Sequence, residues 1–281
     1  MMIANSKIAF VGAGNMAYSL ISGLINSGIN PKNIYASNHN TEKLKTLEQQ
    51  LNIHVDTDNK KIVHDARVVI LCVKPNKINF LLEELQEILL AQNPLLISLA
   101  AGTSIEAIEY LLGKHLSVVR AMPNTPSVIC AGATGLYANG LVSENEQSIA
   151  ESIFRSVGIV VWAKHEKELD IITAVSGSGP AYAFYLMEAM EKAAIEAGLS
   201  SETARVLTIQ TVFGASKLAL EDDEHPQALR EKVTSPNGVT AAAIGHMIEQ
   251  QLAQTINDAI KVGIKRAEEI TQSVLDASKD K

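Results

Sequence analysis

Apolar residues near the start of the chain fall into two successive patterns. A short apolar run at residues 8–11 ends in the turn Gly12-Ala13-Gly14. From Leu20 to Ile25, apolar residues then recur at spacings of three and four, and Gly28 is a typical helix end. The two patterns predict a strand, a tight turn and a helix.

Strand and helix patterns continue to alternate as far as about residue 162. Further strands are expected at 34–37, 67–73, 95–99, 118–121, 132–137 and 159–162, and helices at 41–51, at 79–90, after Thr103 or Ser104, and at 144–157. The run at 67–73 is almost entirely apolar, which is typical of a parallel strand buried on both faces. This order predicts a parallel sheet covered by helices.

The first turn has the form Gly12-x-Gly14-x-x-Ala17. Gly12 permits the tight turn, Gly14 lets the backbone approach a pyrophosphate, and Ala17 lets the helix pack closely on the strand. The helix start adds unpaired N–H groups and a positive dipole end. Because the glycines lie between a strand and a helix, dinucleotide binding is favoured over a plain turn.

Beyond about residue 168 the sequence shows helical patterns, at 181–197, at 201–220 and from Thr240 onward, and no strand pattern. We place the boundary near His165, in the charged segment 164–168. The expected fold class is α/β, with an N-terminal Rossmann-type doubly wound sheet at 1–164 and an all-helical dimerisation and substrate domain at 165–281. The helices at 181–197 and 201–220 are apolar on most sides, which predicts an obligate homodimer; a compact internal bundle is the alternative.

The residues after the second strand bear on the choice of cofactor. An NAD-binding fingerprint places an acidic residue about 20 positions past the glycines, whereas here Ser37 and Asn38 follow, without a carboxylate. The absence of a carboxylate removes repulsion against a 2′-phosphate, and Lys43 and Asn59 could help to bind that phosphate. The sequence leans towards NADP, but no arginine stands nearby.

Small and polar residues follow three other expected strands, where open α/β sheets bind their ligands. They are Val73-Lys74-Pro75, Ala100-Ala101-Gly102 and Asn124, which stands between two prolines. Asn124 is placed to reach the nicotinamide end of a cofactor, and a purely structural asparagine is an equal alternative.

A second candidate anion site lies at Ser235-Pro236-Asn237-Gly238-Val239-Thr240, where a helix of small residues begins. Ser235, Asn237 and Thr240 would supply side-chain donors beside the helix N-terminus. The alternative is a connecting loop in which Thr240 simply caps the helix.

The composition excludes several classes of function. A net charge of −7 over 281 residues argues against a nucleic-acid or anionic-membrane partner. No apolar stretch reaches the ~18–20 residues of a membrane span, and Gly12, Gly14 and Asn15 interrupt the apolar start that imitates a secretory signal. Cys72 and Cys130 both lie in apolar segments, which predicts buried reduced thiols and a cytoplasmic protein. No metal-binding pattern is present in the sequence.

Six motifs occur together in the order found in one family. They are Gly12-Ala13-Gly14-Asn15-Met16-Ala17, Val73-Lys74-Pro75, Ala100-Ala101-Gly102, Met122-Pro123-Asn124-Thr125-Pro126, Ser176-Gly177-Ser178-Gly179-Pro180-Ala181-Tyr182 and Thr234-Ser235-Pro236-Asn237-Gly238-Val239-Thr240. The chain resembles the pyrroline-5-carboxylate reductases over nearly its whole length. That family usually has Gly-Gly where this chain has Asn237-Gly238.

The resemblance implies hydride transfer from NAD(P)H to the C=N carbon of 1-pyrroline-5-carboxylate, an imino acid, which gives L-proline. It implies NADPH as the preferred cofactor with NADH as an option, and dimers that commonly assemble into decamers. The substrate carboxylate would be held, beside Asn237, by Ser235 and by the N–H groups of Gly238, Val239 and Thr240. The Thr240 side chain would hydrogen-bond and protonate the imine nitrogen. Glu166 matches a position near the substrate. The implied cofactor contacts are Gly12, Ala13, Gly14, Asn15, Met16, Ser37, Asn38, Asn59, Val73, Lys74, Pro75, Ala100, Ala101, Gly102 and Asn124.

Two rival functions stay open. A β-hydroxyacid dehydrogenase would need a catalytic lysine in the helix after Ser176-Gly177-Ser178-Gly179, where Lys192 is the only candidate and lies several turns along. A non-catalytic NADP(H)-sensing protein would keep the first glycine turn but would not need the second anion site.

Overall fold

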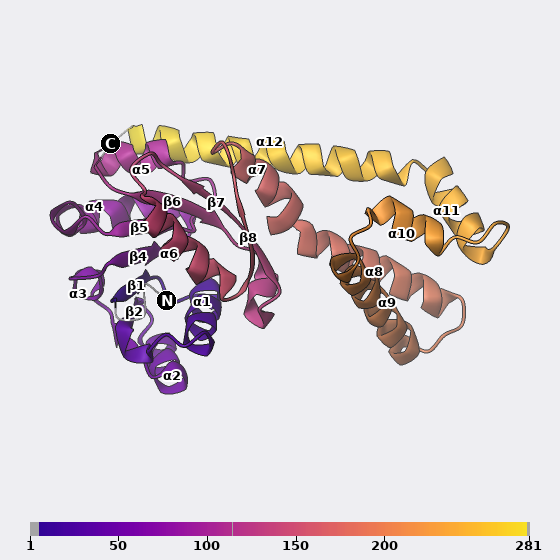
Figure 1. The fold of residues 1–281 in the computed structure, drawn as a ribbon, viewed down its shortest axis with the longest axis horizontal. Coiled ribbons are helices and arrows are strands. Elements are labelled where there is room, and N and C mark those ends of the chain that lie inside the picture. The colour runs from indigo at the N-terminus through magenta and orange to yellow at the C-terminus, as the bar shows by residue number, and fades with distance from the viewer. Residues whose placement is uncertain (1–5, 114, 280–281) are drawn as a thin grey trace. The chain divides into compact units, whose positions relative to one another are not determined.

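The computed structural model describes residues 6–113 and 115–279. The chain divides into two compact units (Figure 1). The sheet unit contains the described residues up to Ser178 together with those from Gly263 onward, and the helical unit contains Gly179–Val262. The expected α/β class, with a Rossmann-type sheet followed by a helical domain, is confirmed.

One sheet organises the first unit. Its strands are β1 (Ile8–Val11), β2 (Ile34–Ser37), β3 (His54–Asp56), β4 (Val68–Leu71), β5 (Leu95–Ser98), β6 (Val118–Met122), β7 (Gly132–Ala138) and β8 (Gly158–Trp162). They lie in the order β3-β2-β1-β4-β5-β6-β7-β8. Neighbours from β3 to β6 are parallel, whereas β7 runs antiparallel to β6 and pairs in parallel with β8. Because β1 lies between β2 and β4, the chain reverses its winding direction beside β1, where open α/β sheets bind ligands.

Helices cover both faces of this sheet. They are α1 (Asn15–Asn26), α2 (Thr41–Leu51), α3 (Asn59–Val63), α4 (Pro75–Gln92), α5 (Ile105–Leu112), α6 (Glu144–Arg155) and α7 (Glu168–Ile172), with short turns η1 (Pro31–Asn33), η2 (Thr125–Ile129) and the π-helical η3 (Thr173–Gly177). Side chains of α1, α2 and α6 share one buried cluster, and those of α3, α4 and α5 share another.

Strand β1 shows how the sequence builds this double layer. Ile8 and Phe10 point into the first cluster, while Ala9 and Val11 point into the second. Successive side chains of a strand alternate between faces. An unbroken apolar run therefore suits a strand with helices on both sides, and all four residues of β4 are likewise buried.

The helical unit consists of α8 (Gly179–Glu196), α9 (Ser201–Glu221), α10 (Pro226–Lys232), α11 (Val239–Glu249) and the first part of α12 (Leu252–Lys279), which continues into the sheet unit. No residue of α8 is buried within this chain. Phe184 and Tyr185 are 63% and 73% exposed. The alternative of a compact internal bundle is therefore wrong, because the apolar sides of these helices are not covered by their own chain.

The structural division differs from the sequence-based boundary near His165. Segment 168–178 stays with the sheet unit, because Leu169 is buried and Ile172 packs directly against Gly135 of β7. The end of α12 returns to the same unit, where Ile270 packs against Gly102. Sequence patterns report local structure, so neither long-range packing arrangement was predictable from helix periodicity.

The expectation that both cysteines are buried is wrong for Cys130, which is exposed. It ends η2 in the left-handed region, with φ of 58°, and Val128 and Ile129 before it are also exposed. That apolar segment is thus a surface turn. Burial raises the pKa of the Cys72 thiol, which keeps it protonated. No helix among the described residues is long and apolar enough to span a membrane.

Candidate functional site

The glycine turn after β1 has the geometry expected of a phosphate-binding turn. Gly12 has φ of +99°, and a Cβ there would lie 2.7 Å from the carbonyl oxygen of Cys72. Gly14 is the N-cap of α1 and offers no side-chain cap, while a Cβ built on it meets nothing within 4 Å. The first turn of α1 therefore presents its N–H groups without a capping side chain, beside open space at Gly14.

Asn38 joins this turn to the loop after β2. Its Nδ2 donates to the carbonyl of Ala13 at 3.0 Å, and its Oδ1 accepts from the Asn40 N–H at 3.0 Å. Asn40 in turn caps α2 by accepting from the Lys43 N–H. The hydroxyl of Ser37 is fully buried and has no hydrogen-bond partner among the described residues. Ser37 instead contributes its carbonyl, which accepts from the Gly12 N–H at 3.0 Å.

The other expected cofactor positions surround the same edge of the sheet, apart from the side chain of Asn59. Lys74 is the N-cap of α4 without a side-chain cap, and Pro75 is its first residue. Gly102 has φ of +72° in the loop after β5. Asn59, at the start of α3, donates from Nδ2 to both carboxylate oxygens of Glu84 at 3.2 Å.

Asn124 is held entirely by protein groups. Its side chain is buried, its Oδ1 accepts from the Ala133 N–H at 2.9 Å, and its Nδ2 donates to the carbonyl and the hydroxyl of Ser176 at 3.1 and 3.3 Å. These contacts support the structural alternative for Asn124. Sequence analysis gave no role to Ser176 beyond its motif.

Glu166 is anchored in the sheet unit. Its Oε1 accepts from Nη1 of Arg120 at 2.7 Å and from the N–H of Ile105, the first residue of α5, also at 2.7 Å. Asp170 lies nearby on α7, and burial raises the pKa of its carboxyl group, opposed by the Arg120 charge. Sequence analysis missed Arg120, although a charged residue inside an apolar strand was a visible signal.

The second anion site lies in the helical unit at the start of α11. Gly238 is the N-cap, with φ of −84° and no side-chain cap, and its N–H donates to the Ser235 carbonyl at 3.0 Å. Thr240 is therefore the second residue of the helix and not its cap, which is against the capping alternative. Asn237 has φ of 60°. Asparagine tolerates the left-handed region better than most residues, so it can replace the glycine usual in the family.

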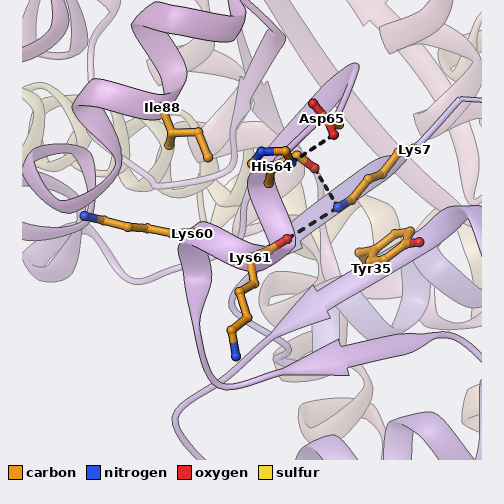
Figure 2. A pocket seen from close by; sticks show the side chains of 7 residues that line it. All are labelled: Lys7, Tyr35, Lys60, Lys61, His64, Asp65 and Ile88. Carbon is orange, nitrogen blue, oxygen red and sulfur yellow. Dashed lines mark hydrogen bonds and ion pairs between the residues drawn. The ribbon is translucent and has the colours of Figure 1, made fainter.

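A hollow of about 630 Å³ lies elsewhere on the sheet unit. Lys7 lines it, donating to the carbonyls of His64 and Lys61 at 2.6 and 3.4 Å and lying 4.0 Å from the Tyr35 ring centre. In Figure 2 the ammonium groups of Lys60 and Lys61 point away from each other and from Lys7. Lys7 holds the end of α3 on the start of β1, and the diverging charges do not form a ligand site. Among the described residues, no three His, Cys, Asp or Glu side chains are grouped to hold a metal ion.

Comparison with known families assigns both parts of the chain. Residues 166–270 match the family described as pyrroline-5-carboxylate reductase dimerisation, and residues 7–102 match the family described as NADP oxidoreductase, coenzyme F420-dependent. The fold and the glycine turn, together with these matches, define an NAD(P)-binding oxidoreductase that carries a helical dimerisation domain.

Individual relatives narrow this class. A pyrroline-5-carboxylate reductase of Pseudomonas aeruginosa is 41% identical, over 97% of this chain and 99% of that protein. The structure of a pyrroline-5-carboxylate reductase from Coxiella burnetii matches with a TM-score of 0.91 and 44% identity, covering 95% of this chain and 98% of the other. A Plasmodium falciparum pyrroline carboxylate reductase, solved with NADP bound, matches with a TM-score of 0.84 and 27% identity, covering 95% and 99%. The chain belongs to the pyrroline-5-carboxylate reductase family.

Proposed function

We propose that this protein reduces 1-pyrroline-5-carboxylate to L-proline with NADPH, the last step of proline synthesis. The observation that carries the proposal is the start of α11, where Gly238 caps the helix and Thr240 lies in its exposed first turn. Protonation of a cyclic imine nitrogen makes the C=N carbon a good electrophile. The protein therefore needs a cradle for one carboxylate and a hydroxyl near the nitrogen.

Ser235 and the first N–H groups of α11 provide that cradle. The Ser235 side chain is exposed next to the helix start, and a Cβ on Gly238 would collide with its hydroxyl oxygen. The backbone N–H groups of Val239 and Thr240 follow Gly238, whose own N–H already donates to the Ser235 carbonyl, and the positive end of the helix dipole favours an anion there. The Thr240 hydroxyl donates a hydrogen bond to the neutral imine nitrogen and transfers its proton there as hydride adds to the C=N carbon, and solvent returns a proton to the exposed Thr240 oxygen. Asn237 holds the left-handed turn that precedes Gly238.

The glycine turn and its neighbours hold the dinucleotide. The clear space over Gly14 fits a pyrophosphate against the N–H groups of Asn15 and Met16, beside Ala13. The loops Val73-Lys74-Pro75 and Ala100-Ala101-Gly102 line the same edge of the sheet. When bound, the reduced nicotinamide supplies the hydride that adds to the C=N carbon. Lys74 places a positive charge at the start of α4, which suits a phosphate-bearing cofactor.

We assign NADPH as the preferred form, with NADH as the weaker alternative. No carboxylate follows β2, where an NAD-binding fingerprint would place one. Asn38 in the loop after β2 and Lys43 in the first turn of α2 are the polar candidates instead. Asn59 is a further candidate that would have to release its hydrogen bonds to Glu84. The Plasmodium relative was solved with NADP bound. Ser37 contributes through its backbone, since its hydroxyl is covered.

Glu166 can serve the substrate while keeping its structural contacts. Both hydrogen bonds that the Glu166 side chain makes among the described residues use Oε1, and the side chain is 26% exposed. Oε2 makes no hydrogen bond within the described part of the chain and is the oxygen that we assign to the substrate.

We further infer a homodimer formed through α8 and α9, because their apolar sides are exposed in the single chain and the dimerisation family model covers them. Assembly of such dimers into a decamer is the larger form that family resemblance suggests. Two free cysteines suit the reducing cytoplasm. Mass measured by light scattering tests the assembly.

One assay tests the reaction against its rivals. The purified protein is given pyrroline-5-carboxylate with NADPH, the same substrate with NADH, and a 3-hydroxy acid with NADP⁺, and NADPH absorbance is followed. We expect turnover with the imine and a higher kcat/KM with NADPH. Turnover of the hydroxy acid alone would support the dehydrogenase rival, and NADPH binding without any turnover would support the sensing rival.

The variant Thr240→Ala tests the role of the hydroxyl. We expect kcat/KM to fall by roughly 10²-fold, at the lower end of acid–base contributions. Thr240→Ser keeps a hydroxyl and should recover most of that loss. An unchanged rate in Thr240→Ala would remove Thr240 from the mechanism.

A further inference from the structure

Asn124 occupies a capping position without acting as a cap. It directly precedes η2, yet its side chain makes no capping hydrogen bond. Asn40 and Ser104 stand at equivalent positions before α2 and α5, and both accept an N–H of their own helix. Asparagine before a helix normally does the same. Pro126, the second residue of η2, has no N–H, and the Ser127 N–H donates to the Asn124 carbonyl at 3.2 Å, so the Asn124 amide is left for more distant partners.

The amide instead closes a three-residue ring of hydrogen bonds. Asn124 Oδ1 accepts from the Ala133 N–H at 2.9 Å, and Asn124 Nδ2 donates to the Ser176 hydroxyl at 3.3 Å. The Ser176 hydroxyl donates in turn to the Ala133 carbonyl at 3.3 Å. Nδ2 also donates to the Ser176 carbonyl at 3.1 Å. The ring ties the loop after β6 to the start of β7 and to the π-helical η3.

This loop borders the proposed cofactor site. It follows β6, on the same edge of the sheet as the loops after β4 and β5. A hollow of about 300 Å³ is lined by Asn15 and Met16 from the start of α1 and by Thr125 and Val128 from η2. Asn124, which the ring fixes, is therefore followed directly by Thr125, which lines the hollow beside the glycine turn.

We infer that Asn124 and Ser176 are positioning residues for the cofactor: they hold the Met122–Pro126 loop in its binding shape, and neither side chain touches the nicotinamide. The inference rests on the proposed use of NADPH. Ser176 lies 52 positions from Asn124 in sequence. The inference predicts that Ser176 nevertheless affects NADPH affinity, because its hydrogen bonds to Asn124 hold the loop in shape. A direct nicotinamide contact by Asn124 would give Ser176 no such effect.

NADPH affinity measured by titration calorimetry, without turnover, tests the inference. Ser176→Ala should raise Kd roughly three- to tenfold, the worth of about one hydrogen bond. Asn124→Ala should raise Kd at least as much. The double variant should add little, about twofold or less beyond Asn124→Ala, because both changes open the same ring. Ser176→Thr keeps the hydroxyl and should restore most of the affinity.

Ser117→Ala is the matched control. Ser117 is buried and Ser176 is half-buried, and the Ser117 hydroxyl likewise donates to a carbonyl, that of Leu141 at 3.1 Å, but Ser117 precedes β6 at the opposite end of the strand. It should lower the unfolding temperature and leave Kd unchanged.

Two results would overturn the positioning role. Ser176→Ala could match Ser117→Ala in Kd while Asn124→Ala binds weakly, which would indicate direct contact. Alternatively, all three variants could bind normally, which would make the ring purely structural. Wild-type protein that fails to bind NADPH would refute the proposed function itself, and this inference with it.

Discussion

Nη1 of Arg120 lies 2.7 Å from Oε1 of Glu166, and the two side chains are 8% and 26% exposed. The same carboxylate oxygen accepts the Ile105 N–H, at the positive end of α5. One carboxylate thus neutralises a buried guanidinium and satisfies a helix terminus that follows the Ala100–Gly102 loop. The pair joins strand β6, helix α5 and the segment before α7.

This relationship predicts an asymmetric response to mutation. Glu166→Ala leaves the buried Arg120 without the carboxylate that pairs with it, although Asp170 also feels its charge, and should lower the free energy of unfolding by about 2–3 kcal/mol. Glu166→Gln keeps an oxygen for both donors and loses only the charge, so about 1 kcal/mol is expected. Urea denaturation measures both. Equal losses in the two variants would show that charge alone, and not the shared acceptor, stabilises this corner.

The two glycines of the first turn should fail in different ways. Gly12→Ala adds a Cβ 2.7 Å from the Cys72 carbonyl oxygen at φ of +99°, so the sheet unit should be destabilised by several kcal/mol. Gly14→Ala meets nothing within 4 Å and should fold normally. Its methyl group would occupy the space needed by the pyrophosphate, so NADPH Kd should rise by roughly tenfold or more.

Circular dichroism melting and NADPH titration separate these two effects. Gly140 offers a control for Gly14, because a Cβ there also meets nothing within 4 Å and it lies outside the proposed site. Gly140→Ala should leave NADPH binding unchanged. A Gly14→Ala variant with wild-type affinity would show that the pyrophosphate does not approach this backbone.

Local patterns were sufficient for much of the sheet unit. The strand at 34–37 and the helix at 41–51 are confirmed to the residue, because each is a short apolar or amphipathic run with clear ends. The helix expected at 79–90 begins earlier, at Pro75, since proline suits the first position of a helix and the loop before it is shorter than expected. Periodicity identifies an element better than it identifies its ends.

Contacts between distant residues were not predictable in this way. The Arg120–Glu166 pair joins residues 46 positions apart, and the Asn124–Ser176 contact joins residues 52 apart. The periodicity of apolar residues along a sequence carries no information about which loops contact each other. The anion site at Ser235 and Thr240 was predicted from the local motif and the helix start. The family, and the roles of these two residues toward the imino acid, came from the order of six motifs along the chain.

The substrate loop offers a test through a steric conflict. Ser235→Ala should mainly raise KM for the imino acid, as expected for lost uniform binding. Gly238→Ala has ordinary φ, but its Cβ would collide with the Ser235 hydroxyl oxygen. It should displace that hydroxyl and raise KM more than Ser235→Ala does.

The double variant decides whether that collision is the cause. Removing the Ser235 oxygen relieves the contact, so Ser235→Ala with Gly238→Ala should return to the KM of Ser235→Ala alone. Steady-state kinetics at saturating NADPH provides the comparison. Additive effects would mean that Gly238 contributes independently of Ser235, and a lowered kcat with unchanged KM in Ser235→Ala would contradict its binding role.

Asp170 predicts a pH dependence of stability. Burial raises the pKa of its carboxyl group, and the charges of Glu268 and Glu166 act in the same direction, while Arg120 and the Thr271 hydroxyl oppose the shift. The folded protein therefore binds a proton more tightly than the unfolded chain does. Stability must fall as pH rises from the ordinary aspartate pKa, about 3.9, through the raised value in the fold. Above that window the ionised Asp170 carries its full desolvation cost.

Asp170→Asn removes this titration while keeping an oxygen for Thr271, whose hydroxyl lies 3.3 Å from Asp170 Oδ1. Its melting temperature relative to wild type should rise as pH increases from about 4 and then level off above the raised pKa of the folded state. Thr271→Val deletes a hydrogen bond that stabilises the ionised carboxylate. The fall in stability with rising pH that wild type shows should therefore extend to higher pH in this variant. Thermal melts at a series of pH values measure all three proteins. A difference between Asp170→Asn and wild type that stays constant with pH would mean that Arg120 and Thr271 balance burial at this carboxylate, and one that falls as pH rises would mean that they outweigh it.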